Sequence, residues 1–472
     1  MKKKIFAVLL LALISVTGIT VTAAAEDYIY CVGSVSKVYA AAAVMKLADE
    51  GKVDIDAPVT EYIPDFTLDD ERYRDITVRM LMDHTSGIMG TTQLGAFCYE
   101  HGALHDDMFL KLLSKQRLKA DPGEYAAYCN DGFDLLALIV ENVTGMDYTD
   151  YVRAELASPT GGRATGSAVD FEKLGTPAPS YTPGNLHMDF GVTEAIGAGG
   201  IYSAAEDVAD FGAGFFEGSK VLLSEKAKRE MVIRWNEGSD DDPYKDGSGL
   251  GWDEVQLAGY EETGVQVLLK GGDALMNHAA LMVAPKEEIS VAVLSNGGSS
   301  ALNALLADAL LQTVLEERGI KKASEESEEY ELAADIPAGY DEFEGFYSSE
   351  DSSGGAVILH VTFPDHKYMH VESIGPARRT TSDLMLIQEV AETGNGRFAE
   401  LAYEIDTDVA SSVDEQLLDA RTAADPEILS FVEGSDGEIY LRADYANVFP
   451  ELGRKENRKY IGEKMGGNPV GQ

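Results

Sequence analysis

The spacing of apolar residues changes along this chain of 472 residues, and that change limits the folds it can adopt. Residues 34–50 and 131–143 place apolar side chains three or four positions apart, as amphipathic helices do. Residues 301–318 show the same helical spacing. Ahead of them lie three short β-rich runs separated by turn residues: Val265–Lys270, Ala279–Ala284 and Ile289–Ser295. Helices, then antiparallel strands, then a closing helix predict an α+β layered domain.

The chain is too long to fold around one ordinary hydrophobic core, so we expect at least two domains. Residues 321–335 are charged and poor in large apolar side chains, which is typical of a linker. Residues 336–472 contain strand-like runs with Gly, Asp and Pro at the turns, which predicts a small all-β domain. The α+β domain is then expected to span residues 26–320.

The N-terminus indicates the compartment. Lys2, Lys3 and Lys4 precede an apolar run from Ile5 to Val21, and Ala23–Ala25 follow. A charged start, an apolar run and small residues predict that residues 1–25 are a secretory signal and that the protein is secreted or extracytoplasmic. An uncleaved anchor is the alternative. No later run reaches membrane length, so we expect no membrane span after cleavage.

The charge of the chain is strongly acidic. Lys and Arg number 38 against 81 Asp and Glu, which gives a formal net charge of -43. Such a surface repels nucleic-acid phosphates and anionic lipids, so we expect neither as a partner.

Three cysteines, Cys31, Cys98 and Cys129, cannot complete a disulfide framework. Their spacing fits neither a zinc site nor a redox pair. We therefore expect three buried thiols, with one disulfide plus a free thiol as the alternative.

Ser34-Val35-Ser36-Lys37 is the one S-x-x-K sequence in the chain. Residues three apart share a face of a helix, so the Lys37 amine can approach the Ser34 hydroxyl. A serine becomes a nucleophile when a neighbour takes its proton, and a lysine can do so if burial or a second cation lowers its pKa. The alternative is a helix N-cap serine followed by an ordinary lysine.

Tyr128-Cys129-Asn130 lies just before the helix predicted at 131–143. Side chains two residues apart in an extended segment project in the same direction, so a proton-relaying phenol and a carbonyl-binding amide would lie together. The alternative for Tyr128 is a packed core tyrosine. A second Y-x-N at Tyr445–Asn447 shows that the pattern is common.

Lys270-Gly271-Gly272 is expected to end the first β-rich run. Two glycines after a strand let another chain approach the backbone closely. Lys270 could supply the positive potential that lowers the pKa of Lys37 and Tyr128. The alternative is an edge-strand lysine that guards against aggregation.

In the order S-x-x-K, Y-x-N, K-x-G, these motifs resemble those of the serine β-lactamase and penicillin-binding protein superfamily. The resemblance is closest to the class C β-lactamase-like branch, whose second motif is Y-x-N. The part with Phe343–Tyr347 resembles β-rich accessory domains of some relatives. Supporting stretches in the first 300 residues are Ile76–Arg79, His84–Gly87, Pro122–Gly123, Gly199–Ser203 with Asp207, and Gly249–Trp252.

The resemblance implies an exported serine hydrolase that acts through a covalent acyl-enzyme on peptides, esters or β-lactam-like amides. It implies no cofactor and no metal. Ser34 would be the nucleophile, Lys37 its proton acceptor, and Tyr128 the group that passes the proton to the leaving group. The expected partner is a small-molecule or peptide substrate, such as a cell-wall peptide.

The resemblance also implies a set of substrate-binding residues. They are Asn130, Lys270, Gly271, Gly272 and Asp273. Asn130 would position the substrate amide, and Lys270 would bind anionic groups. The backbone N–H groups of Ser34 and Asp273 would form the oxyanion hole.

Two features depart from the family pattern. The middle of K-T-G is usually a hydroxyl residue that grips the substrate carboxylate, and here it is Gly271, which leaves esters or other peptides open. Relatives also place a helix and a two-stranded hairpin ahead of the S-x-x-K helix, whereas cleavage after Ala25 would leave Glu26–Gly33 there. The sheet would then lack its N-terminal strands and expose an edge. Either the domain is shortened, another element fills the gap, or the protein begins further upstream.

Three alternatives involve different chemistry. A metallohydrolase would use His101 with His105, or His366 with His370, but no carboxylate-rich cluster accompanies them. A Ser-His-Asp hydrolase needs a G-x-S-x-G elbow where a strand meets a helix, and no such elbow stands there. The third alternative is a non-catalytic cell-wall or peptide-binding protein that keeps the pocket without turnover.

Overall fold

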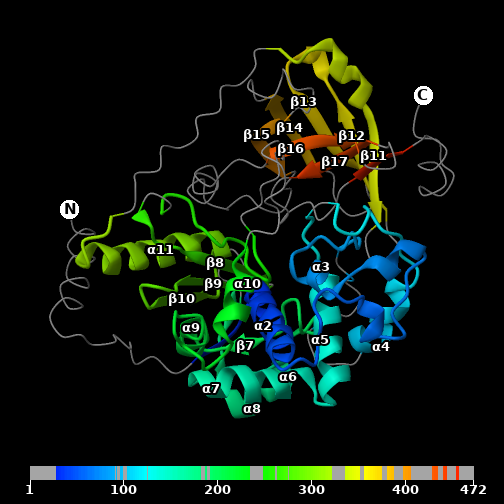
Figure 1. Ribbon diagram of the computed structural model, residues 1–472. Coiled ribbons are helices and arrows are strands. Elements are labelled where there is room, and N and C mark those ends of the chain that lie inside the picture. Colours follow the sequence, from blue (N-terminus) through cyan, green and yellow to red (C-terminus); the bar gives the residue numbers. More distant parts are fainter. Residues whose placement is uncertain are drawn as a thin grey trace.

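A computed structural model gives the fold of this protein (Figure 1). Helices and strands mix in the first two thirds of the chain and strands predominate in the last third, which confirms the predicted α+β class. The described residues are 28–90, 92, 96–98, 104–124, 126–181, 187–188, 192–233, 248–260, 263–274, 276–321, 335–350, 356–374, 380–386, 397–405, 428–433, 439–443 and 453–456.

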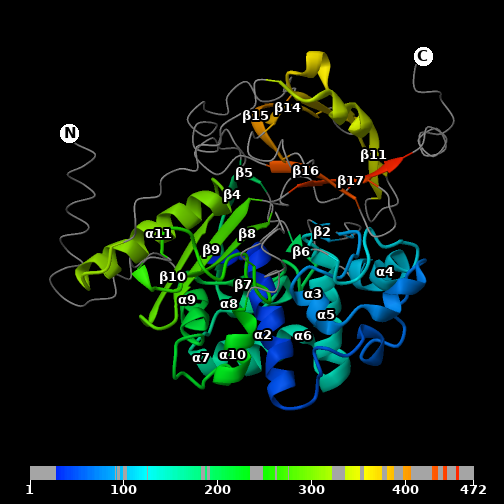
Figure 2. The ribbon, with the colours of Figure 1, turned by 45° about the horizontal axis from the view of Figure 1, so that its top comes forward.

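A three-stranded antiparallel sheet, ordered β10-β9-β8, separates two hydrophobic cores (Figures 1 and 2). Leu281 on the middle strand faces the larger core and its neighbour Met282 faces the smaller one, because side chains alternate along a strand. Helix α9 (Ala205–Ala213) packs on the first face and α11 (Ser300–Glu317) on the second. The strands are β8 (Leu268–Ala274), β9 (Asn277–Ala284) and β10 (Ile289–Ser295).

Helix α2 (Ser36–Asp49) runs through the larger core and follows the 3-10 turn η1 (Gly33–Val35). Its residues are buried on all sides as far as Met45, so it is apolar all round rather than amphipathic. It packs against α5 (Asn130–Thr144), which ends at Gly145 in the left-handed conformation. Both helices lie where the sequence predicts them, but the expectation that the first helix buries one face is wrong, because α2 is enclosed by the larger core.

The prediction that the first β-rich run ends at Lys270 is wrong. Strand β8 continues through Gly271 and Gly272 to Ala274. Both glycines stay in register with alanines of β9, a strand buried almost throughout. The ladder to a buried neighbour therefore outweighs the weak strand preference of glycine.

Strand β1 (Tyr28–Cys31) fixes the segment that leads into η1. It pairs in parallel with β3 (Thr176–Pro177) and antiparallel with β7 (Tyr202–Ser203). The Val32 N–H then donates to the Ile201 carbonyl at 2.9 Å. β1 does not join the three-stranded sheet, and β9 is the one strand partner of β10 among the described residues. The edge of the three-stranded sheet at β10 is therefore unpaired within the described residues, as the sequence predicted.

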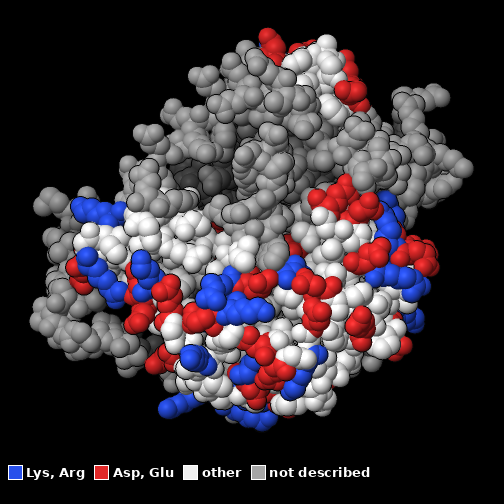
Figure 3. Space-filling model, viewed as in Figure 1, with Lys and Arg blue, Asp and Glu red and all other residues white. Residues whose placement is uncertain are grey.

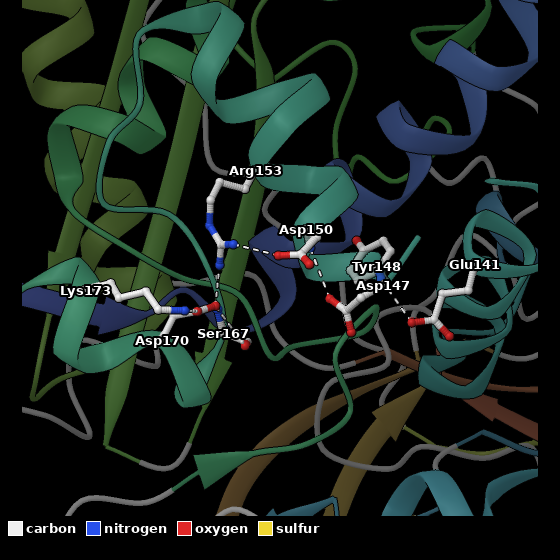
Figure 4. A network of polar contacts seen from close by, with 8 residues as sticks. All are labelled: Glu141, Asp147, Tyr148, Asp150, Arg153, Ser167, Asp170 and Lys173. Carbon is white, nitrogen blue, oxygen red and sulfur yellow. Dashed lines mark hydrogen bonds and ion pairs between the residues drawn. The ribbon is translucent and has the colours of Figure 1, made fainter. Parts of the chain in front are cut away.

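A polar network holds together the segments that follow α5 (Figure 4). Arg153 donates to Asp150 at 2.7 Å and forms an ion pair with the buried carboxylate of Asp170. The Tyr148 N–H donates to Glu141 at 2.9 Å, which ties the next turn of chain to α5.

The other helices and strands of this part are short. The helices are η2 (Val59–Glu61), η3 (Glu71–Asp75), α3 (Val78–Met82), α4 (Leu104–Leu113), α6 (Tyr148–Tyr151), η4 (Val152–Ala157), α7 (Ser158–Thr160), η5 (Ala168–Asp170), α8 (Phe171–Leu174) and α10 (Glu225–Met231). The strand pairs are β2 (Phe97–Cys98) with β6 (Val192–Thr193), and β4 (Ser180–Tyr181) with β5 (His187–Met188). Across the described residues, no helix combines the length and apolar character that crossing a membrane requires.

Among the described residues of the C-terminal part, eight antiparallel strands are present, and β11 pairs with both β12 and β18, so these strands close on themselves. The all-β prediction is confirmed, while residues 322–334 of the expected linker lie outside the described residues. The strands are β11 (Gly345–Glu350), β12 (Ala356–Thr362), β13 (Met369–Ile374), β14 (Thr380–Leu386), β15 (Arg397–Ile405), β16 (Ile428–Glu433), β17 (Ile439–Ala443) and β18 (Gly453–Glu456).

The three cysteines are described, and all are free thiols. Cys31 and Cys129 are buried as expected. Cys98 is half-buried, so the prediction of three buried thiols is wrong at that position, which belongs to a two-residue strand rather than to the core.

Candidate active site

Ser34 is the point at which two distant segments of the chain meet. Its Oγ accepts hydrogen bonds from Tyr128 Oη at 2.7 Å and from Lys37 Nζ at 3.0 Å. Lys37 lies one turn after Ser34 at the start of α2, and Tyr128 comes just before α5. Ser34 is half-buried whereas the Lys37 side chain is fully buried. A substrate can therefore reach the hydroxyl while the amine stays out of bulk water.

Lys37 directs all three donors of its ammonium group to fixed acceptors. They are Ser34 Oγ, Asn130 Oδ1 at 2.7 Å and the Ala198 carbonyl at 2.7 Å. Asp134 holds Ala198 in place by accepting its N–H at 3.1 Å. A neutral Lys37 would keep two donors for Asn130 and Ala198, and its lone pair would then point at the Ser34 hydroxyl. That is the arrangement a general base needs.

His84 packs against the ring of Tyr128. The two rings stack with centroids 4.5 Å apart, and His84 Nδ1 accepts the Cys129 N–H at 3.0 Å. Burial holds the pKa of His84 well below its usual value, and the Lys270 and Lys37 charges lower it further. The ring is therefore neutral and able to accept. The resemblance included His84 in a supporting stretch without a role in the chemistry, and here His84 positions Tyr128.

Lys270 completes the cluster from β8. Its side chain is 1% exposed, and its ammonium forms an ion pair with Asp253 and lies 5.1 Å from the centroid of the Tyr128 ring. Asp253 also accepts the Gly271 N–H at 2.9 Å. The resemblance implied that Lys270 binds an anionic substrate group, whereas here it faces Asp253. The motifs did not identify Asp253, although it directly follows the Gly249–Trp252 stretch.

These charges set the proton affinities of the site. Burial lowers the pKa of Lys37, Tyr128 opposes that shift, and the Lys270 charge lowers the pKa further. Burial by itself raises the pKa of Tyr128, but the positive charges of Lys270 and Lys37 outweigh it and the net shift is downward. Burial would lower the pKa of Lys270, yet Asp253 and Tyr128 raise it overall. Lys270 therefore keeps its charge while Lys37 and Tyr128 release protons more readily.

The outer edge of β8 borders Ser34. Leu269 exchanges backbone hydrogen bonds of 2.9 and 3.1 Å with Glu254 across this edge. Residues two apart in a strand direct their N–H groups to the same edge, so the N–H groups of Gly271 and Asp273 also point there. The Asp273 N–H consequently points toward η1 and Ser34.

Two glycines let η1 and β8 lie in backbone contact. A Cβ on Gly272 would lie 2.2 Å from the Val32 carbonyl oxygen and 2.8 Å from Ser34 N. Gly33 has a φ of 52°, and its Cβ would lie 2.6 Å from Asp273 N. A side chain fits at neither position. The Ser34 N–H belongs to a first helical turn and has no partner within the helix, so it and the Asp273 N–H can serve one oxyanion.

The eight residues predicted from the sequence all lie in these contacting segments. They are Ser34, Lys37, Tyr128, Asn130, Lys270, Gly271, Gly272 and Asp273. For a metal site, the described part of the chain contains no group of three or more His, Cys, Asp or Glu residues arranged as ligands. His101, one of the ligands considered, lies outside the described residues.

Comparisons with known proteins point in the same direction. The family model named Beta-lactamase matches residues 14–315. The putative penicillin-binding protein PbpX of Bacillus subtilis is 30% identical over 209 residues, and the match covers 43% of this chain and 49% of PbpX, about half its length. The D-alanyl-D-alanine-carboxypeptidase/endopeptidase AmpH of Escherichia coli is 28% identical over 294 residues, which cover 57% of this chain and 70% of AmpH.

Solved structures extend the likeness in fold. SurE has a TM-score of 0.64 at 19% identity, and the match covers 92% of this chain and 88% of SurE. The octameric penicillin-binding protein homologue of Pyrococcus abyssi has a TM-score of 0.50 at 20% identity and covers 91% of this chain and 89% of its own. Both matches continue beyond residue 315 into the C-terminal strands.

The contact between η1 and β8 can be tested with a matched pair of substitutions. We expect Gly272→Ala to slow the reaction of Ser34 with a fluorophosphonate by about 100-fold, because the new Cβ forces the backbones of η1 and β8 apart. Gly271→Ala is the control, since its Cβ would meet Ser300 at an ordinary 3.4 Å. Rates of labelling followed on gels measure the effect. Equal rates in the two variants would contradict the assignment.

Proposed function

Because this chain belongs to the beta-lactamase family, we propose that it is a serine hydrolase that forms an acyl-enzyme on Ser34. The observation that carries the proposal is the contact of the Ser34 hydroxyl with both the Lys37 amine and the Tyr128 hydroxyl, at 3.0 and 2.7 Å. The pKa values of Lys37 and Tyr128 are both lowered, which favours proton removal from Ser34.

In the acylation step, neutral Lys37 takes the Ser34 proton while Oγ attacks the substrate carbonyl carbon. The oxygen that becomes negative accepts the N–H groups of Ser34 and Asp273. Tyr128 then gives its proton to the leaving group, the bond to that group breaks, and the Lys37 ammonium returns a proton to Tyr128. The products are an ester on Ser34 and a free amine or alcohol.

In the deacylation step, a water molecule attacks the ester carbonyl. Tyr128 passes its proton to the neutral Lys37 amine, and the resulting phenolate, which the Lys270 charge stabilises, takes a proton from the water. The Ser34 oxygen leaves and regains its proton from Tyr128, and the Lys37 ammonium then returns a proton to Tyr128. Asn130 is tied to Lys37 through Oδ1, and we assign its amide nitrogen to the substrate carbonyl on the acyl side.

The proposed substrates are small peptides, esters or amides. AmpH is a D-alanyl-D-alanine-carboxypeptidase/endopeptidase by name, which supports small peptides as substrates. Gly271 removes the side-chain hydroxyl that relatives place on this strand, which favours substrates other than β-lactams.

We further propose that the protein acts outside the cytoplasm. The support is the charged start at Lys2–Lys4, the apolar run Ile5–Val21 and the alanines at 23–25. N-terminal sequencing of the mature protein should find Glu26 as the first residue. An intact Met1 on protein recovered from the cytoplasm would contradict export.

A second candidate function is a non-catalytic peptide-binding protein, which is favoured by a short sheet whose β10 edge has no further strand partner among the described residues. Labelling separates the two functions. We expect the wild-type protein to react with a fluorescent penicillin or a fluorophosphonate, with the adduct on Ser34 by peptide mass spectrometry. Ser34→Ala should not react, because the nucleophile is gone. If the wild-type protein labels no better than Ser34→Ala, the proposal that this chain is an enzyme is wrong.

The charge of Lys270 should set the pH dependence of acylation. Removing it with Lys270→Gln raises the pKa of Lys37 and Tyr128, so the base loses its proton at higher pH and the acidic limb of kcat/KM moves up by about one pH unit. The double variant with Asp253→Asn removes both charges of the pair and should move the limb less. Rates of ester hydrolysis between pH 5 and about pH 10 measure both. An unmoved limb in Lys270→Gln would contradict this role.

A further inference from the structure

The space that Gly271 leaves on β8 is filled by a side chain that is bound to a carboxylate. At the end of β8, a Cβ on Gly271 would meet the Ser300 side chain at 3.4 Å, so Ser300 from α11 fills that space. The Ser300 hydroxyl donates to Asp273 Oδ2 at 2.6 Å. The nearest hydroxyl to this part of β8 is thus committed to a carboxylate.

Asp273 is held in one position as an anion. Its Oδ1 accepts the Ser300 N–H at 2.9 Å and lies 2.5 Å from His278 Nδ1, which must be the donor because an ionised carboxylate only accepts. Burial alone would raise the pKa of Asp273, but the bonds from His278 and Ser300 outweigh it and the net shift is downward. Its side chain is still 49% exposed. A carboxylate has about four acceptor positions, so it can take one more donor from a ligand.

The cations that the structure describes at the site are already paired. Lys270 forms an ion pair with Asp253. Lys37 donates hydrogen bonds to Ser34, Asn130 and Ala198. A substrate carboxylate arriving at β8 would meet a negative charge and no open ammonium among these residues.

The charge of the protein also favours a cationic group on the substrate over an anionic one. Acidic side chains are spread over the face shown in Figure 3, with Lys and Arg among them. The whole chain carries a formal net charge of -43, which attracts cationic ligands and repels anionic ones.

We propose that the Asp273 carboxylate binds a protonated amino group on the substrate, so that the enzyme prefers aminoacyl amides, esters and peptides with a free α-amine. The inference rests on the proposed acyl transfer at Ser34. The Asp273 N–H is assigned to the substrate oxyanion, so the carboxylate of the same residue lies one side-chain length from the reacting carbonyl. An α-amine is one carbon away from that carbonyl and can reach it.

Two substrates that differ only at the amine test the proposal. They are alanine 4-nitroanilide and N-acetylalanine 4-nitroanilide, each as the D and the L enantiomer, at neutral pH, where the amine is largely protonated. We expect the wild-type protein to favour the free amine by tenfold or more in kcat/KM for the preferred enantiomer. In Asp273→Asn, which keeps the shape and removes the charge, this ratio should fall at least tenfold, mainly through KM of the free-amine substrate.

A control variant and the comparison of the two substrates show whether Asp273 binds the substrate amine or only anchors α11. Glu316→Gln removes the same charge from an exposed position at the far end of α11 and should keep the wild-type ratio. If Asp273→Asn lowers kcat/KM equally for both substrates, Asp273 only anchors α11 and the inference is overturned. Fluorophosphonate labelling of Ser34 separates a failure of this inference from a failure of the proposed function. Labelling without amine preference overturns this inference alone, whereas absent labelling overturns the proposed function.

Discussion

The contact of backbone on backbone between η1 and β8 is the constraint on which the rest of the site depends. It needs glycine at positions 33 and 272, and it brings the backbone of Ser34 close to that of Gly272 and Asp273. β8 is an edge strand, but β9 beside it is buried between two cores, so the position of the edge is set by the whole layer. β1 holds η1 from the other side through the bond from Val32 to Ile201. The geometry of a few atoms is therefore determined by the packing of the domain.

Two buried amines close to one phenol would be costly if both carried an unpaired charge. The structure resolves this by giving them unequal partners. Lys270 faces the carboxylate of Asp253, which favours its charged form, whereas Lys37 faces a hydroxyl, an amide and a carbonyl. Neutral acceptors compensate a charge less than a carboxylate does, so Lys37 is the amine that loses its proton. The partners, not the lysines themselves, assign the roles of fixed charge and base.

The sequence predicted the residues whose relation is local or carried by a motif. Ser34 and Lys37 are one helical turn apart, and the buried helices follow from regular apolar spacing. Asp253, Asp134 and the Ala198 carbonyl were missed because their roles arise only when distant segments pack, and no spacing marks them. The end of β8 was misplaced because glycine is a poor strand former, and only the neighbouring strand, absent from a linear view, outweighs that preference.

The charges of the site form an ordered series from inside to outside. The fixed cation, Lys270, is buried behind Tyr128, and the half-exposed anion, Asp273, lies at the end of the same strand. Between them, two N–H groups face the space beside the nucleophile. A substrate whose carbonyl oxygen becomes negative is drawn toward these N–H groups, while a positive group on its acyl side is drawn toward Asp273. Because side chains alternate along β8, Lys270 and Asp273 point to opposite faces of the strand, so the Lys270–Asp253 pair acts on Tyr128 while the Asp273 carboxylate stays available to a group of the substrate.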